Sequence, residues 1–239
     1  MAEGNSVFDE IRAQHKKMKG KSVKEKAAYF WEYYRVATIV AILVIAFAAN
    51  LIYTIVTAKD SAFHGVLING YTDIDVTSFM EGFESFAQID TNKYSTSLET
   101  DFTLQQDSTD QYTMANIQKF AAMVAAKELA VVIIDPDTFA TYADGGYFYN
   151  LNDLLSDEML NEYEDRLIYY DIPEDGQEDV PAAIRVTDVP FLQETQAYAA
   201  YEDAYLAVIV NTQHPDTVIS FLEYLEQPFT ISGTESEQE

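Results

Sequence analysis

Residues 36–57 carry no charged side chain and are almost wholly apolar, with the sequence VATIVAILVIAFAANLIYTIVT. As an α-helix rising about 1.5 Å per residue, they would reach about 33 Å, against about 30 Å of hydrocarbon in a bilayer. We therefore expect one transmembrane helix from Val36 to Thr57, with the lipid bilayer as its partner.

The basic residues on the two sides of this stretch predict its orientation. Residues 1–35 hold eight Lys or Arg, whereas the whole of 58–239 holds six. Because positive charge near a span stays in the cytoplasm, 1–35 is expected to be a cytoplasmic basic and aromatic leader, with the C-terminal part outside. A capping-box pattern, Ser22-Val23-Lys24-Glu25, predicts that one helix begins at Val23 and continues through the span.

Two other interpretations of the apolar run are open. A cleaved signal peptide would use a small-x-small site, and Ala46-Phe47-Ala48 provides one. The apolar run continues well past that site, however, and the length of the run and of its leader favours a retained anchor. A buried helix of a soluble core would rarely run this far without a charge.

The part of the chain after the span is strongly acidic and contains no cysteine. Residues 58–239 hold six basic and 35 acidic side chains, a net charge of −29. Such a domain repels nucleic acid, so a nucleic-acid partner is not expected. The absence of cysteine excludes disulfides, thiolate metal sites and cysteine nucleophiles, and it is more typical of a bacterial surface than of a eukaryotic ectodomain.

Beyond the span, apolar strand patterns alternate with amphipathic helix patterns. This order predicts an α/β domain with a mainly parallel sheet flanked by helices, in which 130–134 and 206–210 are central strands because they are apolar throughout. We expect a linker at 58–65, the extracellular domain at 66–230 and a disordered acidic tail at 231–239. Strands are expected at 63–69, 94–98, 130–134, 167–170, 183–186 and 206–210, and helices at 76–89, 111–129, 152–163 and 215–225, with a short helix opened by Asp135-Pro136.

No catalytic or cofactor motif is present in the sequence. His64 and His214 are the only histidines after the span, and neither G-x-S-x-G nor S-x-x-K occurs. No phosphate loop or dinucleotide fingerprint occurs either, so we expect neither an enzyme nor a cofactor. The pairs Asp73/Asp75 and Asp135/Asp137 could ligate Ca²⁺, but they lack the spacing of a calcium loop and suit turns and helix caps, so no metal site is predicted.

A ligand-binding edge is predicted from the strand ends. If 66–69, 130–134 and 206–210 are parallel strands of one sheet, their carboxyl ends open a crevice at one rim. The alternative is that Asn69, Asp135 and Asn211 only cap the structures that follow them. The candidate ligand-binding residues are Asn69, Tyr71, Asp135, Asp137, Tyr142, Tyr147 and Asn211.

Two segments of the domain resemble the extracellular solute-binding proteins of bacterial ABC importers, which have the type II periplasmic-binding fold. Residues 119–155, KFAAMVAAKELAVVIIDPDTFATYADGGYFYNLNDLL, resemble that family's helix, core strand and short helix. Residues 204–225, AYLAVIVNTQHPDTVISFLEYL, resemble its strand followed by an amphipathic helix. The segment KEKAAYFWEYYR before the span resembles small anchored membrane proteins of Firmicutes.

The resemblance implies a reduced, one-lobe domain, because the segment 156–182, where a second lobe would be inserted, is short. We expect a membrane-anchored extracellular binding or interaction module, an accessory or docking subunit of a membrane complex such as a transporter, with a protein partner in the membrane or envelope. The alternatives are a module that binds or senses a small ligand with half a cleft, and an envelope hydrolase with an unrecognised site. The expected location is the bacterial cytoplasmic membrane.

Overall fold

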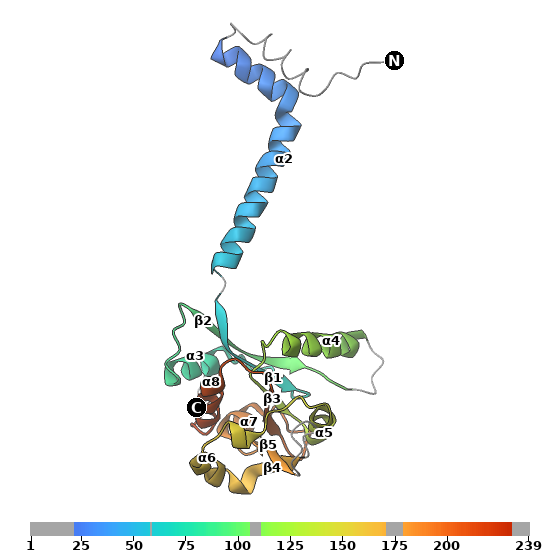
Figure 1. Ribbon diagram of the computed structural model, residues 1–239, viewed down its shortest axis with the longest axis vertical. Helices are drawn as coiled ribbons and strands as arrows, with labels where there is room; N and C mark the ends of the chain where they lie inside the picture. The colour runs from blue at the N-terminus through green and yellow to red at the C-terminus, as the bar shows by residue number, and fades with distance from the viewer. Residues whose placement is uncertain (1–21, 58, 106–110, 171–178, 231–239) are drawn as a thin grey trace, which may run out of the picture. The chain divides into compact units, whose positions relative to one another are not determined.

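The computed structural model describes residues 22–57, 59–105, 111–170 and 179–230 (Figure 1). The chain divides into two compact units, Met1–Ala58 and Lys59–Glu239. In chain order the elements are α2 (Val23–Thr57), β1 (Asp60–Ile68), α3 (Thr77–Phe86), β2 (Tyr94–Phe102), α4 (Gln111–Ala125), β3 (Val131–Ile134), α5 (Pro136–Asp144), η1 (Leu151–Asp153), α6 (Asp157–Glu162), η2 (Glu164–Arg166), β4 (Leu167–Tyr170), β5 (Val180–Arg185), α7 (Pro190–Thr195), β6 (Tyr205–Val208) and α8 (Pro215–Leu225).

The first unit contains one long helix. α2 begins at Val23 and runs without a break to Thr57, as the sequence predicts. Its stretch Tyr34–Thr57 has a mean hydropathy of 2.6 over its most apolar window, and none of that window is buried. Within the described residues it is the one helix long and apolar enough to cross a membrane. A membrane anchor and a signal sequence near the N-terminus share these properties.

The second unit is an α/β domain built on a six-stranded sheet with the order β2-β1-β3-β6-β5-β4. β1 is parallel to both β2 and β3, while the pairings β3–β6, β6–β5 and β5–β4 are antiparallel. The expected α/β class with flanking helices is confirmed, but the expectation of a mainly parallel sheet was wrong, because the sheet is mixed. The error arose because a strand covered on both faces is apolar throughout whichever way it runs.

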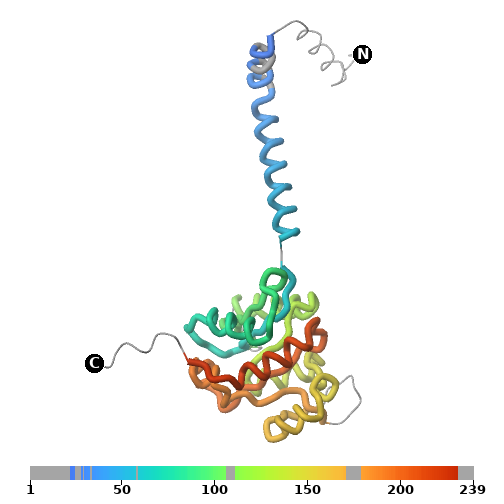
Figure 2. Tube along the Cα trace, turned by 90° about the vertical axis from the view of Figure 1, so that its left-hand side faces the viewer, coloured from blue at the N-terminus to red at the C-terminus, as the bar shows by residue number. Residues whose placement is uncertain are grey.

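Helices cover both faces of the sheet. Successive side chains of a strand point to opposite faces, and two separate buried clusters follow from this alternation. α3, α7 and α8 pack on one face and α4 and α5 on the other, and α3 and α8 lie side by side (Figures 1 and 2). The central strands contribute Leu67, Ile133 and Leu206 to the first cluster and Val66, Val132 and Ala207 to the second.

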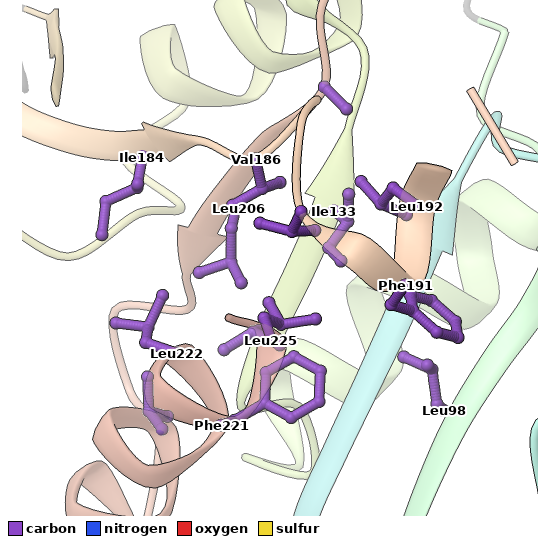
Figure 3. Close-up of a cluster of buried hydrophobic side chains, with 14 of the residues drawn as sticks. Leu98, Ile133, Ile184, Val186, Phe191, Leu192, Leu206, Phe221, Leu222 and Leu225 are labelled. Carbon is purple, nitrogen blue, oxygen red and sulfur yellow. The ribbon is translucent and has the colours of Figure 1, made fainter. Parts of the chain in front are cut away.

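The first cluster is rich in phenylalanine. Figure 3 shows side chains of α8 meeting those of the sheet and α7 there. The rings of Phe79 and Phe191 stack with centroids 4.0 Å apart, and those of Phe63 and Phe221 are 4.3 Å apart. Each fully buried phenylalanine of this kind stabilises the fold by about 1.5–3 kcal/mol through removal of its apolar surface from water. This core, with no disulfide to support it, holds α3, α7 and α8 on the sheet.

Several local boundaries differ from those expected. β1 begins at Asp60, so most of the predicted linker 58–65 belongs to the first strand. The predicted helix 152–163 is interrupted, because Ser156 caps a new helix through a hydrogen bond from the Met159 amide. α7 was not predicted, since six residues are too few to show a helical period. The predicted tail 231–239 lies outside the described residues.

Candidate functional site

The predicted binding residues do not lie on one rim of the sheet. β3 and β6 run in opposite directions, with Val131 opposite Val208 and Ile134 opposite Tyr205. The carboxyl end of β6, which leads to Asn211, is therefore at the opposite end of the sheet from the carboxyl ends of β1 and β3. The prediction of a single rim was wrong for Asn211, and the reason is the direction of β6.

Asn69 and Asp135 do meet, at the carboxyl ends of β1 and β3. Asn69 adopts a left-handed backbone with φ of 59°, and its Nδ2 donates to Asp135 Oδ2 at 2.8 Å and to Thr138 Oγ1 at 2.9 Å. Its Oδ1 accepts the Leu104 amide at 2.8 Å. Asp135 is only 3% exposed and also accepts the Thr138 amide at 3.0 Å as the N-cap of α5. These side chains are satisfied by one another and tie β1, α5 and the segment after β2 together.

Tyr198 packs against the carboxyl ends of β1 and β3. Its hydroxyl is buried and lies 2.8 Å from the Ile68 carbonyl oxygen and 2.5 Å from that of Ile133. Burial raises the pKa of Tyr198 well above its usual value. A Cβ at Gly70 would lie 2.6 Å from the Tyr198 ring, so only glycine fits beneath the ring without displacing it.

Few side chains are exposed at the carboxyl ends of β1 and β3, and acidic residues lie among them. Tyr71 is 71% exposed, and its amide donates to the Ala197 carbonyl at 2.8 Å. Asp137 is exposed in the first turn of α5. The pKa of Tyr201 is raised by partial burial and then by the negative charges of Asp135 and Asp137. A ligand at this edge would meet Tyr71, Asp137 and Tyr201 rather than the buried amide and carboxylate.

The remaining predicted residues pack beneath α4. Tyr142 is 7% exposed, and its ring lies 5.0 Å from that of Phe120 and 5.2 Å from that of Tyr147. Burial raises the pKa of Tyr142 to about 12. Asn211 Nδ2 donates to the Val124 carbonyl at 2.8 Å, while its Oδ1 is buried and has no hydrogen-bond partner in the described part of the chain. These side chains hold α4 on the sheet and do not face solvent as a group.

A depression lies where β1 and β3 begin and β6 ends. It is a shallow, partly open hollow with room for about one water molecule, and it is lined by residues 61–64, 127–130 and 212–214. Both His64 and His214 line it. Burial lowers the pKa of His64, whose Nε2 is 4.0 Å from Glu99 Oε2. Across the described ranges, no three His, Asp or Glu side chains gather closely enough to hold a metal ion.

The sequence prediction missed the exposed side of α4. This helix buries Thr113, Asn116, Phe120 and Met123, which leaves the opposite side in solvent. Met114 is 47% exposed there, whereas Tyr112, although 53% exposed, lies on the flank next to β2, where its hydroxyl donates to the Asp101 carbonyl at 3.3 Å. We call this exposed side the α4 outer face, and it consists of Met114, Ala115, Gln118, Ala121, Ala122 and Ala125.

The α4 outer face has no acidic residue, in contrast to the rest of the domain. Residues 111–127 contain no Asp or Glu, although 58–239 contains 35. Lys119 borders the face, and its Nζ is 2.6 Å from Glu99 Oε1 on β2, so its charge is already paired. The signal that could have revealed this face is the acid-free run itself, read together with helical spacing.

Compared with models of protein families, with curated protein sequences and with solved structures, the chain gives no match.

Proposed function

We propose that the chain is a single-pass protein of a bacterial cytoplasmic membrane whose acidic domain, outside the cell, docks onto a protein partner. In this proposal α2 is a retained anchor, the leader 1–35 is cytoplasmic, and the chain is an accessory subunit of a membrane complex. A reduced, one-lobe solute-binding-like domain fits this role, because a single lobe keeps its outer surfaces but has no enclosed cleft.

The α4 outer face is the observation that carries the proposal. The centres of protein interfaces are enriched in Tyr and Met and depleted in charged residues, since removing a carboxylate from water is costly. Met114 is half exposed on this face, and the alanines on the same side of the helix lose no side-chain entropy on contact. A partner can therefore cover this face without burying a carboxylate of α4.

The described geometry gives less support to the capture of a small solute. The depression beside His64 has room for only about one water molecule, far below the range of about 300–1,000 Å³ that is usual for ligand pockets. At the other end of the sheet, Asn69 and Asp135 are hydrogen-bonded to each other. A hydrolase is supported less still, because a catalytic histidine needs a hydroxyl or thiol nucleophile in hydrogen-bond reach. No such bond to His64 or His214 occurs among the described residues.

Site-specific crosslinking in living cells tests docking at this face. Because the chain has no cysteine, Ala122→Cys places a single thiol on the α4 outer face, and Ala200→Cys places one at another exposed alanine of the domain. Both are labelled with a photoreactive maleimide, irradiated, and the adducts are identified by mass spectrometry. We expect one reproducible membrane-protein adduct with Ala122→Cys, absent with Ala200→Cys and lost when Ala121→Glu is added.

Equal adducts from the two positions, or none from Ala122→Cys, would contradict docking through α4. Insensitivity of the adduct to Ala121→Glu would do so too, because a buried carboxylate in the contact costs several kcal/mol unless it finds a partner. Circular dichroism of the variants verifies that Ala121→Glu leaves the domain folded, as expected for an exposed helix position.

A further inference from the structure

We propose that two copies of the chain associate in the membrane through α2, with the side-chain amides of Asn50 hydrogen-bonded to each other. The inference rests on the proposed retention of α2 as an anchor, and it adds a second copy of this chain to its partners. It is independent of the α4 outer face.

Asn50 lies deep within the apolar part of α2. At about 1.5 Å per residue it is about 7 Å from the middle of Tyr34–Thr57 and about 10 Å from the end at Thr57. A bilayer core is about 30 Å thick, so Asn50 lies inside the hydrocarbon whether the span is Val36–Thr57 or Tyr34–Thr57. At such a depth no water is available to the amide.

The Asn50 amide has no partner on its own helix. A primary amide carries two N–H donors and a carbonyl acceptor, and within the described residues none of those of Asn50 makes a hydrogen bond. The two threonines that follow differ in this respect. Thr54 Oγ1 donates to the Asn50 backbone carbonyl at 3.0 Å, and Thr57 Oγ1 donates to that of Tyr53 at 2.7 Å. Asn50 is therefore the most deeply placed polar side chain of 50–57 whose hydrogen-bonding capacity remains to be met, whereas the Tyr53 hydroxyl lies nearer the end of the span, where aromatic side chains reach the interface.

The surroundings of Asn50 on the helix allow close approach of a second helix. Ala46, four residues before it, and Thr54, four residues after it, lie on the same side at the 3.6-residue period, flanked by the larger side chains of Phe47 and Tyr53. Small side chains beside a polar one let two backbones come near enough for amides to bond across the interface. Ile45, Ala48 and Ile52 point away from this side and present only apolar groups to lipid.

A second copy is the occupant that these facts favour. All copies of a single-span protein insert with the same orientation, so their Asn50 side chains lie at the same depth. The amide is both donor and acceptor, so two copies related by a two-fold axis can exchange two hydrogen bonds. The net charge of −29 on each outer domain opposes association, but salt screens that repulsion beyond about 8 Å at physiological ionic strength.

Disulfide trapping of the full chain in native membranes tests the proposal. Ala46→Cys puts the only thiol of the chain on the side of Asn50, and Ala48→Cys puts it on the other side of the same helix. After mild oxidation, dimers are measured on non-reducing gels. We expect Ala46→Cys to trap at least about fivefold more dimer than Ala48→Cys, Asn50→Leu to remove about nine-tenths of that dimer, and Asn50→Gln to restore it.

Three results would overturn the proposal: equal trapping at the two positions, trapping that Asn50→Leu leaves unchanged, or trapping of Ala46→Cys onto a different protein. Mass spectrometry of the intact chain distinguishes a failure of two copies to associate from a failure of the proposed anchor to be retained. A chain cleaved near Ala48 would lack the thiol introduced by Ala46→Cys altogether and would refute retention, whereas a full-length chain that fails to pair refutes only the association.

Discussion

Replacement of Asp135 by alanine removes two contacts that the structure assigns to one buried carboxylate. The first is the cap on α5, a hydrogen bond of 3.0 Å from the Thr138 amide, and such caps contribute about 0.5–2 kcal/mol. The second is the hydrogen bond of 2.8 Å from Asn69 Nδ2, whose loss leaves a half-buried amide with only Thr138 Oγ1 as acceptor. An incompletely satisfied buried donor costs about 1–3 kcal/mol. We expect Asp135→Ala to lower the free energy of unfolding by about 2–4 kcal/mol.

Asp137→Ala is the matched control, two residues away on the same helix. Its carboxylate is exposed and acts only through the positive end of the α5 dipole, an effect of about 0.3–1 kcal/mol. Urea denaturation of the full chain in detergent, followed by near-ultraviolet circular dichroism of the domain's tyrosines, measures both variants. Equal losses for the two variants, or a loss below about 1 kcal/mol for Asp135→Ala, would refute the assignment of a structural tie to Asn69 and Asp135.

Three further outcomes follow from the structure. Gly70→Ala should lower the free energy of unfolding by about 1–3 kcal/mol in the same urea assay, because its Cβ would lie 2.6 Å from the ring of Tyr198. Burial raises the pKa of Tyr142 and Tyr163 to about 12 in the folded state, above the ordinary tyrosine pKa of 10.0. The free energy of unfolding should therefore be fully retained below pH 10.0 and should fall as the pH rises toward 12. A flat profile between these two pH values would contradict the burial of both tyrosines. The melting temperature should rise with NaCl through screening of the net charge of −29 and should not rise further with micromolar Ca²⁺ at constant ionic strength, whereas a saturable Ca²⁺ effect would reveal a cation site.

The elements with strong local patterns could be predicted from the sequence. The continuous helix from Val23 to Thr57 follows from a capping box and the absence of Pro and Gly. The central positions of β3 and β6 follow from apolar residues at successive positions, and both are buried in the sheet. The cap of α5 follows from Asp135-Pro136, and the structure shows the hydrogen bond from the Thr138 amide that this pattern predicts.

Strand direction could not be predicted in the same way, and the candidate site depended on it. A strand buried on both faces has the same composition in either direction, so nothing in Tyr205–Val208 marks β6 as antiparallel to β3. Because β6 runs antiparallel to β3, Asn211 lies at the opposite end of the sheet, where its Nδ2 donates to the Val124 carbonyl. Asn69 and Asp135 stayed together because β1 and β3 are parallel, as expected.

The exposure of side chains on α4 also required the structure. The sequence shows that 111–127 lacks acidic residues, but it does not show which side of the helix faces the sheet. Burial of Phe120 and Met123 places Met114, Ala121 and Ala122 in solvent. The structure therefore shows which residues of the acid-free run 111–127 form the α4 outer face, on which a partner could dock.

Labelling of single cysteines in intact cells tests the central claim, a retained anchor with the acidic domain outside, most directly. Ser22→Cys places the thiol just before α2 and Ala200→Cys places it in the domain, and each full chain is treated with a membrane-impermeant maleimide before and after lysis. We predict that the chain keeps its full-length mass, that Ala200→Cys reacts in intact cells, and that Ser22→Cys reacts only after lysis. Reaction of Ser22→Cys in intact cells, or a mature chain that begins near Ala49, would contradict the account.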